Sequence, residues 1–153
     1  MAQYLSAELG GANATANITS APVGWKPKAS VYGGRLRRIR ATFTLGSTAV
    51  TTSDTLAVGN LPSGATFAYG VLTASVTMGA SATLAIGNAS STGKYRAAAT
   101  FTSADTPTFF GVNTAVGAAD PGLSADEAVI VTIGTASLPT SGTLIVDLYY
   151  SMP

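Results

Sequence analysis

From residue 33 onward, the sequence is a series of short runs in which apolar and polar residues alternate. In the run 35–45, every second residue from Ile39 to Leu45 is apolar, whereas the residues between them are arginine or threonine. A period of two residues places these two sets on opposite faces of a half-buried β-strand. No long helical stripe accompanies the runs, so the pattern indicates an all-β domain.

Similar runs recur along the rest of the chain, rich in Val, Ile, Leu and Thr and separated by turn-forming Gly, Pro, Asn and Ser. The predicted strands cover residues 35–45, 54–58, 67–78, 82–86, 94–101, 108–112, 127–133 and 143–150. The triplet Gly79, Ala80 and Ser81 predicts a β-hairpin between the third run and the fourth. Seven or eight short strands favour an antiparallel β-sandwich with jelly-roll or Greek-key connections, and a narrower barrel is the alternative.

Residues 1–30 differ in texture from the rest of the chain. They are rich in small polar residues, contain Pro22, Gly24 and Pro27, and follow no strand alternation. Such a segment buries too little apolar surface to fold alone. We therefore predict an extended N-terminal arm, residues 1–30, and a β-sandwich domain, residues 31–153. The arm is either a frayed terminus or a strap laid across a neighbouring subunit, whose anchors would be Tyr4, Leu5, Leu9 and Trp25.

The low charge of the chain points to a covered surface. Of its 153 residues, 46% are hydrophobic and 10% are charged, whereas soluble domains average about 25% charged residues. A surface so poor in charge favours coverage by copies of the chain or by a partner. The net charge of +1 argues against a nucleic-acid partner. No run approaches the ~18 apolar residues that span a bilayer, and residues 1–10 do not resemble a secretory signal, so we expect no membrane partner.

Histidine and cysteine are both absent from the sequence. Their absence excludes His-based triads, thiolate nucleophiles and the usual zinc and copper sites. Asp126 and Glu127 stand side by side where a strand begins, so their side chains diverge and do not form an acid–base pair. Asp120 and Asp126 would offer oxygen ligands to calcium, but their spacing is not that of an EF-hand. We expect no enzyme activity, no catalytic residue, no cofactor and no metal site.

A basic stretch is the one group of residues in the sequence that suggests a binding site. Six of the eight lysine and arginine residues lie within residues 26–40. On a strand, Arg38 and Arg40 point away from the core, while Arg35 and Arg37 have the other parity near the exposed start of the strand. Guanidinium groups favour carboxylates and phosphates in bidentate geometry. We therefore take these four arginines as candidate partner-binding residues.

Three interpretations of this stretch remain open. The arginines would contact acidic patches of a partner protein, or they would be solvated charges that protect an edge strand from stray pairing. Binding to nucleic acid is the third interpretation, and it is weakened because only Tyr32 is available nearby for base stacking. The contact with a partner protein is favoured, with the solvated edge second.

Four segments of the predicted domain carry a resemblance to a known family. They are ATLAIGN (82–88), GKYRAAA (93–99), AVIVTIG (128–134) and LPTSGTL (138–144). In this order they resemble small structural proteins of tailed bacteriophages, and the nearest type is a head decoration, or cement, protein. The resemblance covers residues 33–150 and rests on texture and order rather than on a diagnostic motif, so no partner-binding residue is transferred from it.

The resemblance implies a β-sandwich, commonly a homotrimer, on the outer capsid surface of the virion. Its partner would be the major capsid protein, and the chain would be made in the host bacterial cytoplasm. In this hypothesis the N-terminal arm reaches neighbouring subunits, while the arginines of residues 35–40 meet acidic capsid surface. The function is then to stabilise the assembled shell, because a protein that binds only the shell favours it over dispersed subunits.

Two other classes of function compete with this hypothesis. A carbohydrate- or receptor-binding module of a phage fibre or tail would stack sugars on aromatic rings, and the candidates are Trp25, Tyr69, Tyr95, Phe109 and Phe110. These rings are scattered over the sequence, which argues against a common sugar-binding face. A small lyase or depolymerase on a β scaffold is the other competitor, and the scarcity of titratable residues argues against it.

Overall fold

The computed structural model describes residues 35–111 and 122–152. In these residues the chain forms eight strands, each of which overlaps a strand predicted from the sequence. They are β1 (Arg35–Thr44), β2 (Thr55–Leu61), β3 (Thr66–Ala74), β4 (Thr83–Gly87), β5 (Arg96–Thr100), β6 (Thr108–Phe110), β7 (Glu127–Gly134) and β8 (Thr143–Met152). The predicted arm, residues 1–30, lies outside the described residues. Residues 35–111 and 122–152 contain no helix that is long and apolar enough to cross a membrane.

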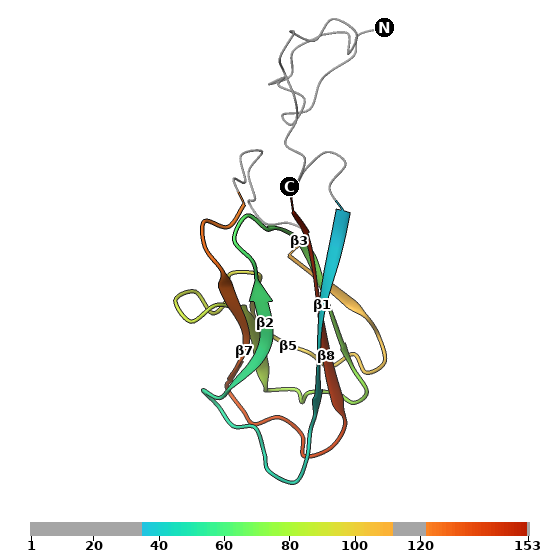
Figure 1. Ribbon diagram of the computed structural model, residues 1–153. Coiled ribbons are helices and arrows are strands. Elements are labelled where there is room, and N and C mark those ends of the chain that lie inside the picture. The colour runs from blue at the N-terminus through green and yellow to red at the C-terminus, as the bar shows by residue number, and fades with distance from the viewer. Residues whose placement is uncertain (1–34, 112–121, 153) are drawn as a thin grey trace, which may run out of the picture.

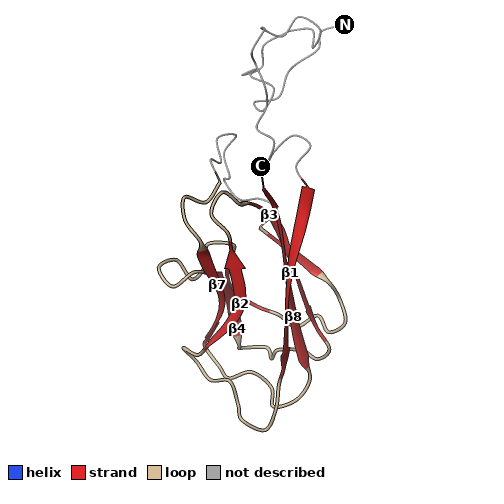
Figure 2. Ribbon diagram, viewed as in Figure 1, coloured by secondary structure: helices blue, strands red, loops and turns tan. Residues whose placement is uncertain are grey.

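The strands form two four-stranded antiparallel sheets that face each other (Figures 1 and 2). One sheet has the order β1-β8-β3-β6 and the other the order β2-β7-β4-β5. The first strand therefore pairs with the last, the second with the next to last, and so on inward to β4 and β5. This nested pairing is that of a jelly roll. The predicted all-β sandwich is confirmed, and the narrower barrel was wrong.

The hairpin predicted at Gly79–Ser81 is wrong, because β3 and β4 belong to different sheets. β3 ends at Ala74, and the chain then crosses from one sheet to the other. The alternation continues past Ala74 because Met78, with 0% of its surface exposed, closes this end of the core. The backbone N–H of Met78 donates to the carbonyl of Phe101 at 2.9 Å, which ties the crossing to another loop.

The core lies between the sheets, and its largest contribution comes from β7 and β8, an interior strand of each sheet. Alternate residues of both strands point inward and are fully buried, as the period of two requires. The most buried side chains of these strands are Val129, Val131, Ile133, Leu144, Val146 and Leu148. Leu72 of β3 and Leu84 and Ile86 of β4 complete the same cluster. Because the core uses one parity of each strand, the other parity is left to form two outer faces.

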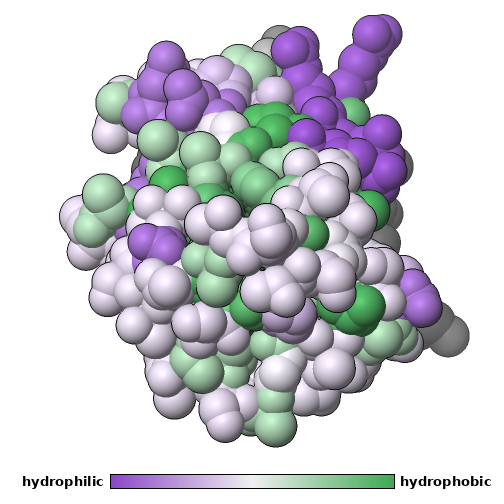
Figure 3. Space-filling model, turned by 90° about the horizontal axis from the view of Figure 1, so that it is seen from below, coloured by the Kyte–Doolittle hydropathy of each residue, from purple (hydrophilic) through white to green (hydrophobic). Residues whose placement is uncertain are grey.

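The end of the molecule opposite Arg35 is weakly polar. Figure 3 views this end from below, and most of the surface there is pale, with strongly hydrophilic residues mainly at the margin. The loops at this end cover residues 45–54, 75–82, 101–107 and 135–142, in which only Asp54 and Asp105 are charged. The cations of the described residues therefore lie elsewhere, on β1 and near the starts of β5 and β7.

Candidate partner-binding surface

β1 is an edge strand that pairs with β8 along its whole length. Arg38 and Arg40 lie on the outward side, opposite Tyr149 and Asp147 of β8. Arg35 and Arg37 have the inward parity, but they stand near the end of the sheet and are exposed. The structure thus places all four arginines at the surface and divides them into two pairs with different surroundings.

The two outward arginines differ in how they use Asp147. Arg40 holds this carboxylate in a bidentate grip, with Nε donating to Oδ1 at 2.8 Å and Nη2 donating to Oδ2 at 2.6 Å. Only 5% of the surface of Asp147 is exposed. The hydrogen bond to Asp147, followed by its charge, raises the pKa of Arg40. Nε of Arg38 is 4.0 Å from the same carboxylate, so Arg38 retains hydrogen-bonding capacity for a partner.

Sequence reasoning missed the role of Asp147, which lies 107 positions from Arg40. A signal was present, because a lone carboxylate in the middle of an apolar strand is rare unless it is paired. The sequence does not say which cation is the partner, since that depends on β1 lying beside β8. The four candidate arginines are therefore not equivalent, and Arg40 is already paired within the chain.

A row of aromatic rings crosses the same outer face. The Tyr69 ring on β3 lies 4.7 Å from the ring of Tyr149 on β8, nearly parallel to it at 21°. The Phe109 ring on β6 lies 5.7 Å from Tyr69 on the other side, tilted by 53°. The exposed large hydrophobic residues of the described chain are Phe109, at 61%, and Leu36, at 57%. We call Leu36, Arg38, Tyr69, Phe109 and Tyr149 the aromatic–arginine face.

The five aromatic residues proposed for sugar stacking lie in different places in the structure. Tyr69 and Phe109 are brought together on one face, so the argument that the rings are scattered was wrong for these two. Tyr95 and Phe110 are buried, with their rings 4.3 Å and 6.4 Å from that of Phe67. Trp25 lies outside the described residues, as do the proposed arm anchors Tyr4, Leu5 and Leu9.

The outer face of the second sheet has a different character. Its outward positions on β2, β4 and β7 carry no charged and no aromatic side chain. They are Thr55, Ala57, Asn60, Thr83, Ala85, Gly87, Ala128, Ile130, Thr132 and Gly134. The hydroxyl oxygen of Thr132 is shielded from solvent and has no hydrogen-bond partner among the described residues. Apart from Ile130, this face therefore offers small or weakly polar groups and little that would anchor a partner.

The cation Arg96 binds backbone carbonyls of its own chain. It stands at the start of the edge strand β5, and its guanidinium donates to the backbone carbonyls of Leu84, Ala99 and Thr100. Burial lowers its pKa. A guanidinium that serves three carbonyls stabilises the irregular pairing of β4 with β5, in which the register shifts between Leu84 and Ile86.

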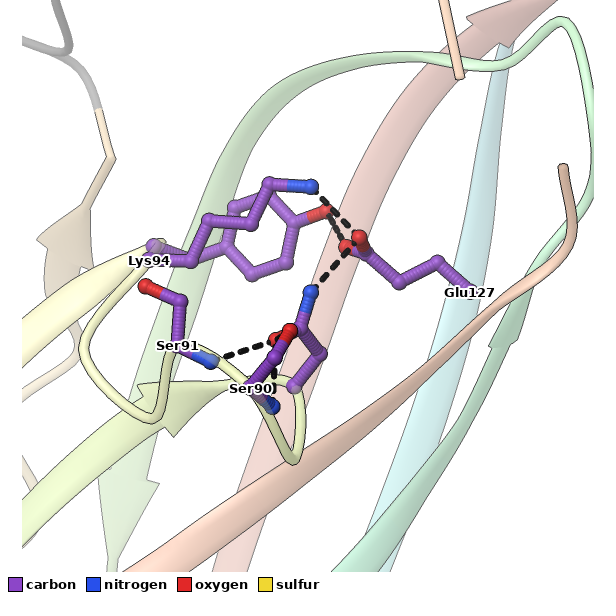
Figure 4. Close-up of polar contacts among 6 residues, drawn as sticks. Ser90, Ser91, Lys94 and Glu127 are labelled. Atoms are coloured by element: carbon purple, nitrogen blue, oxygen red, sulfur yellow. Dashed lines mark hydrogen bonds and ion pairs between the residues drawn. The ribbon is translucent and has the colours of Figure 1, made fainter. Parts of the chain in front are cut away.

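A second polar cluster surrounds Glu127 at the start of β7 (Figure 4). Oε2 of Glu127 accepts hydrogen bonds from Lys94 Nζ at 2.5 Å and Asn88 Nδ2 at 2.8 Å, and the Tyr95 hydroxyl donates to Oε1. Oδ1 of Asn88 in turn accepts the backbone N–H groups of Ser90 and Ser91. Burial raises the pKa of Glu127, but these donors and the charge of Lys94 outweigh it, so the net pKa is lowered. The cluster fixes the 88–94 loop to β7.

An open pocket of about 460 Å³ lies beside this cluster, between residues 88–94 and residues 123–128. Asp126 lines it but turns away from Glu127, since its Oδ1 accepts the backbone N–H of Ser63 at 2.8 Å. The divergence expected from the sequence is thus observed. Within residues 35–111 and 122–152, no three His, Cys, Asp or Glu residues form a group suited to a metal ion. Asp120, the other carboxylate considered for calcium, lies outside these ranges.

Comparison with known proteins links this arrangement to solved capsid structures. No protein-family model matches the sequence, and no curated protein matches it. A chain of the cyanophage Pam1 capsid asymmetric unit is similar, with a TM-score of 0.63, 20% identity, and coverage of 90% of this chain and 98% of that chain. A chain of the capsid of Ralstonia phage GP4 has a TM-score of 0.59 and 19% identity, with coverage of 88% and 93%. These similarities establish a shared fold.

Proposed function

We propose that this chain is a structural protein of a bacteriophage virion, without enzymatic activity, that decorates the outside of the capsid. One observation carries the proposal: the fold is shared, over 98% and 93% of the neighbours' own lengths, with chains of two phage capsid structures. The resemblance of the sequence to phage decoration proteins supports the same assignment. The lack of histidine and cysteine agrees with a structural role.

In this proposal the chain binds the assembled shell and not its dispersed subunits. Binding one state of an equilibrium stabilises that state by mass action, so the chain would hold the shell together. The partner would be the major capsid protein, and the chain would bind it as a homotrimer. Residues 1–30 would form an arm that reaches neighbouring subunits through Tyr4, Leu5, Leu9 and Trp25. The protein would be made in the host bacterial cytoplasm and reside on the outer surface of the virion.

The experiment uses particles of a bacteriophage that encodes the chain. Particles stripped of the protein are mixed with the purified full-length chain and sedimented, and the bound fraction is measured against protein concentration. We expect saturable binding to intact shells, none to dispersed capsid subunits, and a trimer by light scattering. A full-length chain that stays in the supernatant with intact shells would contradict the assignment.

The contribution of the arm is tested separately. A variant that lacks residues 1–30 is compared with the full-length chain in the same sedimentation assay, and its fold is checked by circular dichroism. When the bound particles are diluted, we expect a smaller fraction of the variant than of the full-length chain to stay on the shell. Equal retention of both would show that the arm takes no part in binding.

A carbohydrate- or receptor-binding module of a phage fibre or tail is the second candidate. The specific observation in its favour is the aromatic row, since exposed rings on one sheet face are suited to stacking on sugars. Tyr69 and Tyr149 stack on each other at 4.7 Å, however, so each covers one face of the other and Phe109 is the most exposed ring of the row. This geometry makes the row a weaker sugar platform. Glycan-array binding that Phe109→Ala abolishes would favour this candidate.

A further inference from the structure

We propose that the aromatic–arginine face is the surface that docks on the partner, and that the partner presents carboxylates set in an apolar protein surface. This inference rests on the proposed function and deepens it, because it names the side of the sandwich that meets the shell. It also divides the arginines of β1, with Arg38 as a contact residue and Arg40 as a positioning residue.

The composition of the face is that of a protein interface. Aromatic residues and arginine are enriched at the centre of such interfaces, and they dominate the binding energy. Leu36 and Phe109 are the two large hydrophobic residues that the described chain leaves exposed, at 57% and 61%, and both belong to this one face. Phe109 lies beside the stacked pair Tyr69 and Tyr149, and Leu36 lies on β1 one outward position from Arg38, so the face has residues on all four strands of the sheet.

The charges on this face identify the chemistry of the occupant. Each oxygen of Asp147 accepts a hydrogen bond from Arg40. Arg38, with half of its side chain exposed, lies at 4.0 Å from that carboxylate, whereas Arg35 and Arg37, although exposed, have the inward parity and do not belong to this face. The ion pairs recorded for β1 in the described chain involve only Arg38 and Arg40. Two arginines, Arg38 and Arg40, share the one carboxylate of Asp147 on this face, so the face carries an excess of positive charge that a carboxylate-bearing surface would complement.

The same excess argues against a second copy of this chain as the occupant. A two-fold contact would place the same positively charged patch on both subunits, so two patches with an excess of the same charge would face each other. Like charges brought together in an interface are unfavourable. A sugar is also a poorer fit, because it leaves the arginines without carboxylate partners and finds the Tyr69 and Tyr149 rings stacked on each other.

The Arg40–Asp147 pair gives the face its shape. Asp147 lies between β1 and β3 in the register of the sheet, opposite Arg40 on one side and Val71 on the other. Because Nε and Nη2 of Arg40 are both held by Asp147, its guanidinium is fixed over β8. Arg38, one step along the outward side and next to Tyr149, is the arginine available for contact.

The test measures binding of full-length variants to stripped particles. Arg38→Glu and Phe109→Ala alter the face at exposed positions, and Leu36→Ser is a third variant for the case in which one of them fails to fold. Thr55→Glu and Ile130→Ala are matched controls on the outer face of the other sheet. We expect Arg38→Glu and Phe109→Ala each to weaken binding by about tenfold or more and the controls to change it by less than about twofold. Melting temperatures verify that each variant is folded.

Each outcome has a distinct meaning. If wild type binds the particles and the face variants bind equally well, the docking face is wrong while the proposed function stands. If the controls weaken binding and the face variants do not, the opposite sheet is the docking side. If wild type binds no particle, the proposed function fails and this inference with it. Retention that falls with added salt for wild type but not for Arg38→Glu would support the carboxylate partner.

Discussion

The outer faces of the two sheets differ, although the sheets have the same number of strands and the same pairing rule. On the interior strand β8, the outward residues include Asp147 and Tyr149. Asp147 accepts hydrogen bonds from Arg40 of β1, and Tyr149 stacks on Tyr69 of β3. On the interior strand β7, the outward residues are Ala128, Ile130 and Thr132, whose neighbours are equally small or uncharged. Both strands bury the same kind of apolar residue on the inward side.

The difference between the outer faces shows which residue positions the core of the fold constrains and which it does not. The inward parity is fixed by the need to fill one core, so it is alike in the two sheets. The outward parity is free of that constraint, so the residue types there differ between the two sheets. Exposed aromatic and leucine side chains on one face alone are therefore the basis of the proposed docking face.

The largest expected difference between the faces concerns Asp147. Asp147→Asn removes the charge from a side chain that is 5% exposed and accepts two hydrogen bonds from Arg40. We expect the free energy of unfolding to fall by about 2 kcal/mol, since hydrogen bonds to charged groups contribute about 1.5–3 kcal/mol. Urea unfolding measures this change.

Asp105→Asn is the control for that variant. Asp105 is an exposed carboxylate in the loop between β5 and β6, and its positive φ of 54° is a conformation that asparagine tolerates. We expect it to change stability by less than about 0.5 kcal/mol. Equal effects of the two substitutions would mean that Asp147 is not specially held, and the outer faces would then differ less than the structure indicates.

Glu127 bears on the comparison of the two sheets, because it is a charged residue of the second sheet, at the start of β7. Glu127→Gln removes the ion pair with Lys94 and weakens the contacts with Asn88 and Tyr95. We expect a loss of about 1 kcal/mol at neutral pH, since these are hydrogen bonds to a carboxylate at a partly exposed site. Chemical denaturation across a pH series measures it.

The pH dependence of this effect has a definite sign. The pKa of Glu127 is lower in the folded protein than its ordinary value of 4.5, so the unfolded chain binds the proton more readily. The stabilisation is therefore present above the ordinary pKa and is lost as pH falls through the folded pKa. The difference between wild type and Glu127→Gln should shrink as the solution is acidified. A difference that grows at low pH would contradict the hydrogen-bond network.

The smallest expected effect is on the opposite sheet, at Thr132. Its shielded hydroxyl lacks a partner among the described residues, and valine has nearly the same shape. We expect Thr132→Val to leave stability unchanged or raise it by up to about 1 kcal/mol, because a shielded polar group without a hydrogen bond is unfavourable. Thr132→Ser, which keeps the hydroxyl, is the control. A marked loss of stability in Thr132→Val alone would reveal a partner for the hydroxyl.

The sequence predicted the strands well because each depends on local alternation. The run from Arg38 to Leu45 is an example, since its period of two residues alone separates the core side from the side of Arg38 and Arg40. The hairpin at Gly79 failed because the choice of sheet for β4 depends on how the whole chain packs around Met78. A turn signal shows that the chain reverses direction and leaves open which sheet the next strand joins.

The candidate surface was predicted only in part, for a similar reason. The arginines of β1 are adjacent in sequence, so their clustering is visible without a structure. Asp147, Tyr69 and Phe109 come from three other strands, and only the sheet order β1-β8-β3-β6 brings them together. Chemistry assembled across strands depends on register, which local sequence does not specify when partners lie far apart in the chain.

The most direct test of the contrast between the outer faces uses the absence of cysteine from the chain. Thr42→Cys places a single thiol on the outward side of β1, and Thr55→Cys places one on the outward side of β2, both at exposed threonines of edge strands. Maleimide labelling is measured for each variant, free and bound to stripped phage particles. We expect both thiols to react in the free protein, and binding to protect the thiol of Thr42→Cys while that of Thr55→Cys stays reactive. Protection of the Thr55→Cys thiol alone, or of neither thiol on bound particles, would contradict the docking of the β1-β8-β3-β6 face.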